Sequence, residues 1–326
     1  MATMPNPASS TQQAQGSYIA QADRGGTAMV NVYQAAAPAP VGGAMLAQAN
    51  ARLAELPLDG VPSSAGLPAG SSMPFLPNKL FVGREPDLRA LAAALKAGGT
   101  SVLSQSTAVT GMGGVGKTQL ACEFAWRYGQ YFAGGVFWLG CADPAAIPAE
   151  IATCGRGLNL PAGFTGLPLD EQVSLVAQAW HSQLPRLLVF DNCEDEAVLE
   201  DWLPRGGGCR VLVTARRGAW RPELAVQAIS LGILNRSESI DLLRGHQRDL
   251  AADDPALAAI AAELGDLPLT LHLAGKFLAL GRHEAFGRPA AYLAALQRPD
   301  LLEHQSLPWM AARRRVTSSM WPRPLR

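Results

Sequence analysis

The sequence lacks an excess of charge of either sign: its 326 residues carry 27 lysines and arginines and 27 aspartates and glutamates. Such balance argues against a dedicated nucleic-acid binder, which usually has a basic surface and a high pI. No stretch reaches the roughly 18 uncharged apolar residues of a membrane-spanning helix. The first 15 residues carry neither a basic residue nor an apolar block, so a signal peptide is not expected. We therefore expect a cytoplasmic protein with no membrane partner and no specific nucleic-acid partner.

The five cysteines show no C-x-x-C spacing. At 48% apolar residues the chain is also long and apolar enough to fold without disulfide staples. We expect free thiols in a reducing compartment. The length itself predicts about two domains.

Residues 1–78 contain no lysine and only two arginines, and Ala, Gly, Pro, Ser and Gln dominate them. This composition predicts a mostly disordered, low-complexity leader and linker. Two β-prone runs flank Gly25-Gly26 and indicate a short hairpin at 16–33, although an unstructured leader fits the same residues. An isolated hairpin is marginal in water, so the N-terminal segment is a candidate for self-association or for binding an effector protein.

From residue 79 onward, short apolar runs alternate with helical patterns, which predicts an α/β fold: a three-layer arrangement with a parallel sheet between helices. The expected strands are Ala108–Thr110, Val136–Leu139, Leu187–Asp191 and Val211–Thr214, and helices are expected at Glu85–Lys96, Thr118–Tyr128 and Asp170–Gln183. Only helical patterns follow: Ser237–Gly245, Pro255–Leu264 and Leu269–Gly281.

These patterns divide the chain into an α/β domain at 79–232, a helical subdomain at 233–300 and an irregular basic tail at 301–326; the glycine-rich motif Gly111–Thr118, described next, makes 79–232 the expected P-loop nucleotide-binding domain. Residues 308–326 include five arginines and no acidic residue. The tail either binds an acidic surface or is an altered terminus that replaces an expected domain.

The strongest motif, Gly111-Met112-Gly113-Gly114-Val115-Gly116-Lys117-Thr118, fits G-x-x-x-x-G-K-[ST] at every fixed position. Glycines allow the backbone to curl its N–H groups around phosphates, and the helix that follows presents its positive end to the anion. Lys117 would act catalytically on the terminal phosphates, and Thr118 would bind Mg²⁺. The expected nucleotide-binding residues of this loop are Gly111, Gly113, Gly114, Val115, Gly116, Lys117, Thr118 and Gln119.

Two further strands supply the other half of a phosphate site. Four apolar residues precede Asp191, which is expected to hold Mg²⁺ through water. Asn192 follows where many ATPases place a second acid, and an amide cannot accept a proton, so hydrolysis should be slow at best; Glu194 and Asp195 are candidate substitutes. Arg216 follows the next strand and should face the same crevice, where it would sense a γ-phosphate; a solvated surface arginine is the alternative.

Together these residues resemble the NB-ARC type of STAND signal-transduction ATPase over about residues 79–281. The resemblance rests on Phe81-Val82-Gly83-Arg84-Glu85, the P-loop, the strand Gly135–Leu139, the acidic strand LLVFDN, the run VLVTARR and Gly265-Asp266-Leu267-Pro268-Leu269. It implies that Val82, Gly83 and Arg84 lie beside the adenine and that Pro268 packs near adenine and ribose. It also implies a switch that is closed with ADP and opens with ATP. No winged-helix motif or repeat sensor follows His283, so the chain resembles a bacterial member truncated before those regions.

Three functions remain open. The first is a regulatory switch in signalling or defence that binds ADP or ATP with Mg²⁺ and is at most a slow ATPase. The second is a non-catalytic, ADP-binding interaction protein. The third is a P-loop small-molecule kinase, which would need a substrate pocket and an arginine-rich lid that the sequence does not show.

Overall fold

The computed structural model describes residues 41–97, 100–105, 113–204 and 206–298, with backbone only at 100–105. The chain divides into two compact units, Met1–Ala36 and Ala37–Arg326. The first unit, with the whole of the predicted hairpin, and the predicted basic tail lie outside the described residues. The following account concerns the second unit.

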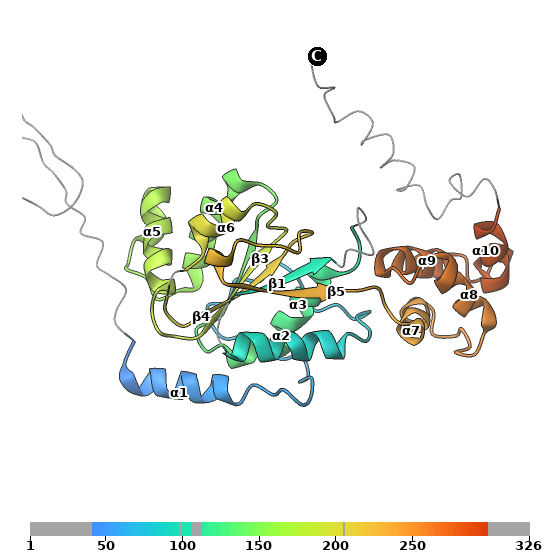
Figure 1. Ribbon diagram of the computed structural model, residues 1–326, viewed down its shortest axis with the longest axis horizontal. Helices are drawn as coiled ribbons and strands as arrows, with labels where there is room; N and C mark the ends of the chain where they lie inside the picture. Colours follow the sequence, from blue (N-terminus) through green and yellow to red (C-terminus); the bar gives the residue numbers. More distant parts are fainter. Residues whose placement is uncertain (1–40, 98–99, 106–112, 205, 299–326) are drawn as a thin grey trace, which may run out of the picture. The chain divides into compact units, whose positions relative to one another are not determined.

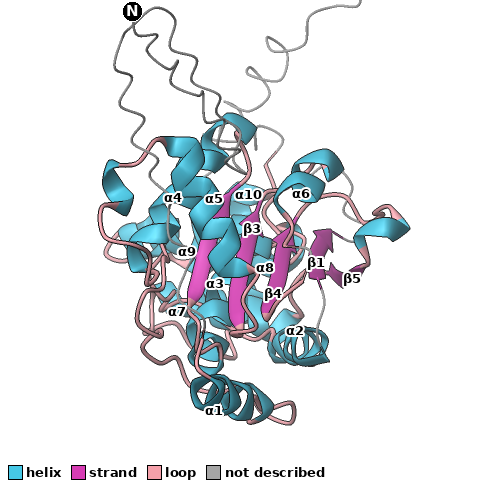
Figure 2. Ribbon diagram, turned by 90° about the vertical axis from the view of Figure 1, so that its left-hand side faces the viewer, coloured by secondary structure: helices cyan, strands magenta, loops and turns pink. Residues whose placement is uncertain are grey.

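The centre of this unit is a five-stranded sheet in the order β2-β3-β4-β1-β5, in which every pair of neighbours is parallel (Figure 2). The strands are β1 (Thr100–Gln105), β2 (Val136–Gly140), β3 (Arg186–Asp191), β4 (Cys209–Thr214) and β5 (Val226–Leu231). The predicted α/β class with a parallel sheet is confirmed. The predicted strand Ala108–Thr110 lies outside the described residues, and β1 precedes it in the chain.

Helices cover both faces of the sheet, which explains why β2, β3 and β4 contain continuous apolar runs. Val136 and Trp138 of β2 face a core built with α2 (Glu85–Ala97) and α3 (Lys117–Tyr128). Phe137 and Leu139 face the opposite core, built with α4 (Ile147–Cys154), α5 (Leu169–Trp180) and α6 (Glu196–Trp202). The alternation follows from the two-residue period of a strand and produces the three layers visible in Figure 1.

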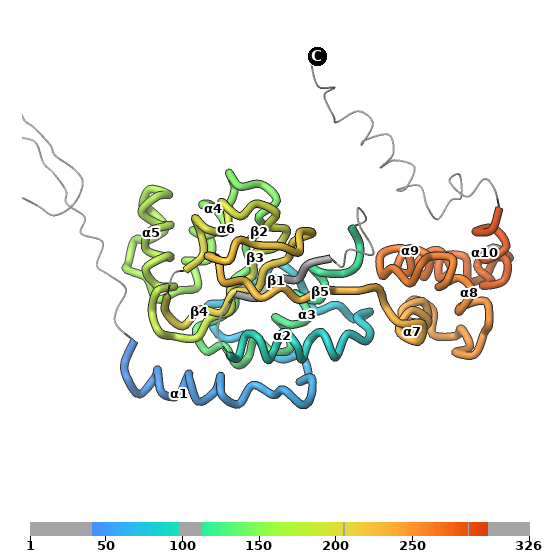
Figure 3. The backbone as a smooth tube through the Cα atoms, in the orientation of Figure 1, coloured from blue at the N-terminus to red at the C-terminus, as the bar shows by residue number. Residues whose placement is uncertain are grey.

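A separate helical subdomain follows β5, with its own apolar core (Figure 3). It comprises α7 (Arg236–His246), α8 (Pro255–Glu263), α9 (Pro268–Leu280) and α10 (Pro289–Leu296). Asn235 caps α7 in a reciprocal capping box with Glu238, and Asp254 caps α8. β5 ends at Leu231 and α7 begins at Arg236, on either side of the predicted domain boundary.

The prediction that residues 1–78 are mostly disordered is wrong for residues 41–78. Helix α1 (Gly43–Ala54) buries Ala49 and Leu53, and Leu56 beyond it is also buried. The chain then runs along α3 and adds Ser72 to the edge of β2, through hydrogen bonds from Ser72 N–H to Val136 O and from Trp138 N–H to Ser72 O. Composition alone missed this order because a partner surface outside the segment supplies the burial.

Several shorter elements were also not predicted, namely α4, α6, α10 and β5. Strand β5 lies at a sheet edge and exposes much of its length, so it has no continuous apolar run. Helices α4 and α10 each have a proline in the first turn. In a sequence pattern such a proline indicates a helix break, but the first turn of a helix tolerates it. Within the described residues, no helix has the length and apolar character needed to cross a membrane.

We expect Leu56→Ala to destabilise the protein by about 2–4 kcal/mol, because it removes a fully buried side chain from the core beside α3. Leu58→Ala is the matched control, since Leu58 is 42% exposed two residues later. Urea unfolding of both variants measures the difference. Equal stability of the two variants would mean that the segment does not pack as described.

Candidate nucleotide-binding site

A cavity of about 840 Å³ lies between the sheet domain and the helical subdomain. The P-loop and the carboxyl end of β4 line one side of it, and the first turns of α9, with residues of α7, line the other. Ligands of open parallel sheets bind at this edge, outside the carboxyl ends of the strands. The fold therefore places this cavity where a phosphate ligand is expected.

The described part of the P-loop has the backbone that the glycines predict. Gly114 has φ +111° and Gly116 has φ +96°, both in the left-handed region that favours glycine. A Cβ on Gly114 would also lie 2.8 Å from Leu269 Cβ, and Leu269 N–H donates to Gly114 O at 3.2 Å. The loop thus rests directly against the start of α9, while Gly111 lies outside the described residues.

Asp191 joins the P-loop helix to the tips of two strands. Its Oδ1 accepts hydrogen bonds from Thr118 Oγ1 at 2.8 Å and from Thr214 Oγ1 at 2.5 Å. Thr214 Oγ1 in turn accepts from the N–H of Asn192 at 2.9 Å. A hydroxyl and a carboxylate at this separation form a donor set of hard oxygens that fits Mg²⁺.

Lys117 is the first residue of α3 and lines the cavity. Burial lowers the pKa of its ammonium, Glu194 and Asp191 counteract that shift, and Arg216 adds to it. The lysine therefore lies within electrostatic range of two carboxylates and one guanidinium. A polyphosphate in the cavity would meet two cations beside a carboxylate that can hold a metal ion.

Arg84 is 7% exposed and connects the two sides of the cavity. Its guanidinium donates to Val115 O of the P-loop at 3.2 Å and to Gly232 O, between the subdomains, at 2.8 Å. Its backbone N–H donates to Glu238 Oε1 of α7 at 3.1 Å, and its φ of +62° is left-handed. Burial lowers the pKa of Arg84, with Asp87 offsetting part of the shift. A strained, buried arginine thus links the P-loop to the helical subdomain.

Gly83 is needed for the same junction. Its φ is +61°, and a Cβ there would lie 2.0 Å from Glu238 Oε1. The carboxylate of Glu238 accepts from the backbones of both Arg84 and Asn235. The capping box that starts α7 is therefore shared with the segment that resembled a family motif.

The residues after β3 and β4 meet at the sheet edge. Arg216 lines the cavity, and Glu194 accepts from its backbone N–H and its Nε. Asp195 accepts from Ala197 N–H as the cap of α6. Both candidate substitutes for a second catalytic acid therefore have structural partners, and Asn192 itself lines the cavity with its amide.

Two histidines lie together in the helical subdomain, and one of them, His272, lines the cavity. His246 Nε2 and His272 Nδ1 share a hydrogen bond of 3.1 Å. Burial lowers the pKa of His246 to about 4, with His272 and then Lys276 adding to the shift. The pair is therefore neutral near pH 7.

The structure brings the sequence-predicted residues together with few exceptions. Those lining the cavity are Val82, Arg84, Gly113, Gly114, Val115, Gly116, Lys117, Thr118, Gln119, Arg216 and Pro268. Asp191 lies behind Thr118, and Gly83 adjoins Arg84. Sequence reasoning did not assign a site role to Leu76, Asn78, Leu80, Phe81, Thr214, Leu234, Leu242, Leu269 and His272, which also line it. Helical spacing would have found His272, one turn after Pro268.

Comparison with known proteins gives relatives over the same region, although no protein-family model matches. The chain is 32% identical over 222 residues to the regulatory protein AfsR of Streptomyces griseus, covering 66% of this chain and 22% of the relative. It is 33% identical over 129 residues to a nucleotide-binding leucine-rich repeat (NLR)-like protein of Hyaloscypha variabilis, covering 38% of this chain and 13% of that protein. The chain thus spans about a fifth or less of the curated relatives it matches.

The AfsR and NLR-like relatives are consistent with the resemblance of the ordered motifs to an NB-ARC/STAND P-loop NTPase. A solved STAND protein with a tetratricopeptide repeat sensor from Pyrococcus horikoshii is 20% identical, covering 64% of this chain and 31% of its own, with a TM-score of 0.38. That similarity is too low to add to the argument. The resemblance to the STAND type therefore rests on the ordered motifs, with the AfsR and NLR-like relatives in agreement.

We expect Arg84→Ala to lower the free energy of unfolding of the ligand-free protein by about 2–4 kcal/mol, because two buried carbonyls lose their donor. Arg89→Ala is the control, since Arg89 lies in α2, which begins just after Arg84, and makes an exposed contact of 3.4 Å with Asp59 O. Denaturant unfolding without nucleotide measures both. Unchanged stability of Arg84→Ala would mean that the side chain does not hold the junction.

We also expect stability to fall as the pH drops from 6.5 towards 4. The pKa of His246 is lower in the folded protein than in the unfolded chain. In this pH range the unfolded chain therefore binds a proton that the folded protein does not bind. One such group contributes at most ~1.4 kcal/mol per pH unit, and partial exposure reduces this. His246→Asn should flatten the profile measured by chemical denaturation, whereas the same change at the exposed His283 should not. Parallel profiles for both variants would contradict the assignment.

Proposed function

We propose that this chain is a regulatory nucleotide switch that binds ADP or ATP with Mg²⁺. One observation carries the proposal: Lys117, Thr118, Asp191 and Arg216 converge at the phosphate side of a cavity whose far wall is the helical subdomain. A ligand held between two subdomains can alter their relation, as a switch requires. The relatives named regulatory and NLR-like support a role in signalling or defence.

Different residues of the chain would bind different parts of the nucleotide. The curled loop and the first turn of α3 present N–H groups to the phosphates, and Lys117 supplies the mobile cation. Thr118 and Asp191 would hold Mg²⁺, with Asp191 acting through water; the metal would screen the phosphate charge. Arg216 is positioned to meet a terminal phosphate. Val82 and Pro268 contribute to the less polar part of the cavity, which suits a base and a ribose.

The geometry favours slow hydrolysis. An amide at Asn192 cannot take a proton from water, Asp195 caps α6, and Glu194 is paired with Arg216. These features support a switch with long-lived nucleotide states over a rapid ATPase. Four buried cysteines and one partly buried cysteine, all free, are consistent with a reducing cytoplasm.

The same lack of a placed base supports a second candidate, a non-catalytic ADP-binding interaction protein. Both candidates bind nucleotide, so turnover separates them. Slow but saturable phosphate release that needs Mg²⁺ supports the switch, and release indistinguishable from a Lys117→Ala variant supports the binding protein. Under either proposal, the N-terminal segment would mediate self-association or bind an effector protein.

We expect ADP at about 100 times its dissociation constant to stabilise the protein by about 2.7 kcal/mol. Lys117→Ala should remove most of that stabilisation and leave the ligand-free protein nearly unchanged, because Lys117 serves the phosphates. Lys276→Ala is the control, from α9 outside the residues that line the cavity. Thermal unfolding with and without ADP measures the shifts, and equal shifts in all three proteins would overturn the site.

A further inference from the structure

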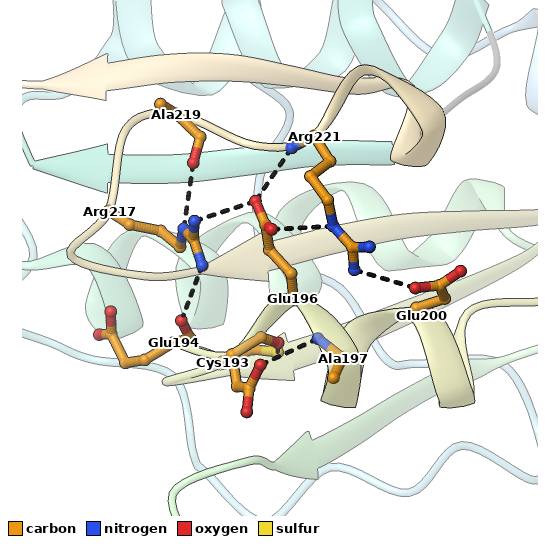
Figure 4. Close-up of polar contacts among 9 residues, drawn as sticks. Cys193, Glu194, Glu196, Ala197, Glu200, Arg217, Ala219 and Arg221 are labelled. Atoms are coloured by element: carbon orange, nitrogen blue, oxygen red, sulfur yellow. Dashed lines mark hydrogen bonds and ion pairs between the residues drawn. The ribbon is translucent and has the colours of Figure 1, made fainter.

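The loop that carries Arg216 is fixed to α6 by a cluster of arginine–glutamate pairs (Figure 4). Glu196 accepts from Arg217 Nη2 and from Arg221 Nε, each at 2.9 Å, and also from the backbone N–H of Arg221. Arg221 Nη2 donates to Glu200 at 2.9 Å. Arg217 also donates to the backbone carbonyls of Glu194 and Ala219. The loop between β4 and β5 is therefore held at several points.

Arg216 lies at the cavity end of this fixed loop and has its own partner. Glu194 Oε1 accepts from Arg216 N–H at 2.9 Å and from Arg216 Nε at 3.1 Å, and Oε2 accepts from the N–H at 3.1 Å. One carboxylate thus holds both the backbone and the guanidinium of Arg216. The pair adjoins the cluster around Glu196, because Arg217 of that cluster also donates to the backbone carbonyl of Glu194.

The position of this pair beside the cavity and Lys117 is the decisive feature. Arg216 lines the cavity, and both Arg216 and Glu194 act on the pKa of Lys117. In the structure described, Glu194 accepts a hydrogen bond from the Nε of Arg216. To contact a terminal phosphate, the Arg216 guanidinium would have to leave this carboxylate. The carboxylate therefore competes with the third phosphate for the same cation.

We propose that Glu194 is a positioning residue that sets the preference of this site between nucleoside diphosphate and triphosphate. It holds Arg216 while a diphosphate is bound and must release it when a γ-phosphate arrives. This inference rests on the proposed nucleotide-binding function and extends it, because it assigns the selection to an acidic residue outside the phosphate-binding loop. Glu194 subtracts from the affinity for the triphosphate and leaves that for the diphosphate unaltered.

The exposure of the pair sets the size of the effect. The side chains of Arg216 and Glu194 are 66% and 32% exposed. Exposed pairs of this kind shift equilibria modestly. We expect Glu194→Gln, which keeps the volume and one acceptor, to tighten ATP binding by about two- to fivefold with little change for ADP. Glu200→Gln is the matched control, since Glu200 is paired with Arg221.

A double-mutant cycle gives the sharpest test. Dissociation constants of ADP and ATP with Mg²⁺ are measured by calorimetry for the parent, Glu194→Gln, Arg216→Ala and the double variant. The gain for ATP should appear in the parent background and vanish when Arg216 is absent. A gain that persists without Arg216, equal changes for ADP and ATP, or no change at all would overturn the proposal.

A measurement without nucleotide separates this inference from the proposed function. Glu194→Ala removes the acceptor of the Arg216 amide, so hydrogen exchange of a peptide containing Arg216 should accelerate in the ligand-free protein, while Glu200→Ala should leave it unchanged. Unaltered exchange would show that Glu194 does not hold Arg216. If exchange accelerates but the protein binds neither ADP nor ATP, the pair exists and the proposed nucleotide function is wrong. The proposed selection between ADP and ATP would then be wrong as well.

Discussion

The hydrogen bond from Thr118 to Asp191 is the contact on which the phosphate side of the site depends. It joins the first turn of α3 to the tip of β3, and Thr214 of β4 donates to the same carboxylate oxygen. Three elements from separate parts of the chain are thereby held at one edge of the sheet. The positive end of α3, the lysine that begins it and an oxygen set suited to Mg²⁺ are close together because that carboxylate is shared.

The opposite wall depends on a second junction, made by backbone conformations that most residues avoid. Gly83 and Arg84 both adopt left-handed φ values, and this turn directs the Arg84 amide to Glu238 and its guanidinium to Val115 and Gly232. Strain of this kind persists only where surrounding contacts compensate for it. Here the contacts join the P-loop to the subdomain that would move in a switch, so the strained turn lies where binding and conformational change must meet.

Local sequence predicted much of the fold. Apolar strands buried on both faces show as continuous runs, which is why β2, β3 and β4 were predicted within one or two residues of their bounds. Prediction from local sequence failed where a segment is buried by contacts with distant parts of the chain. Leu56 and Ser72 belong to a segment whose composition predicts disorder, yet α3 and the edge of β2 supply the partners that order it. Strand β5 was missed for a related reason, since its side chains are mostly exposed or only partly buried and give no continuous apolar run.

The sequence by itself determined the motif of the loop, a lysine and a hydroxyl after closely spaced glycines at a helix start, and this motif predicts phosphate binding. It also identified Asp191 and Arg216 as residues at the carboxyl ends of parallel strands. Only the tertiary structure decided what engages them: Glu194 holds Arg216, Arg84 binds the P-loop carbonyl, and Leu269 rests on Gly114. Such pairings join residues that are 22 to more than 150 positions apart, and packing of the whole unit, not local propensity, brings them into contact.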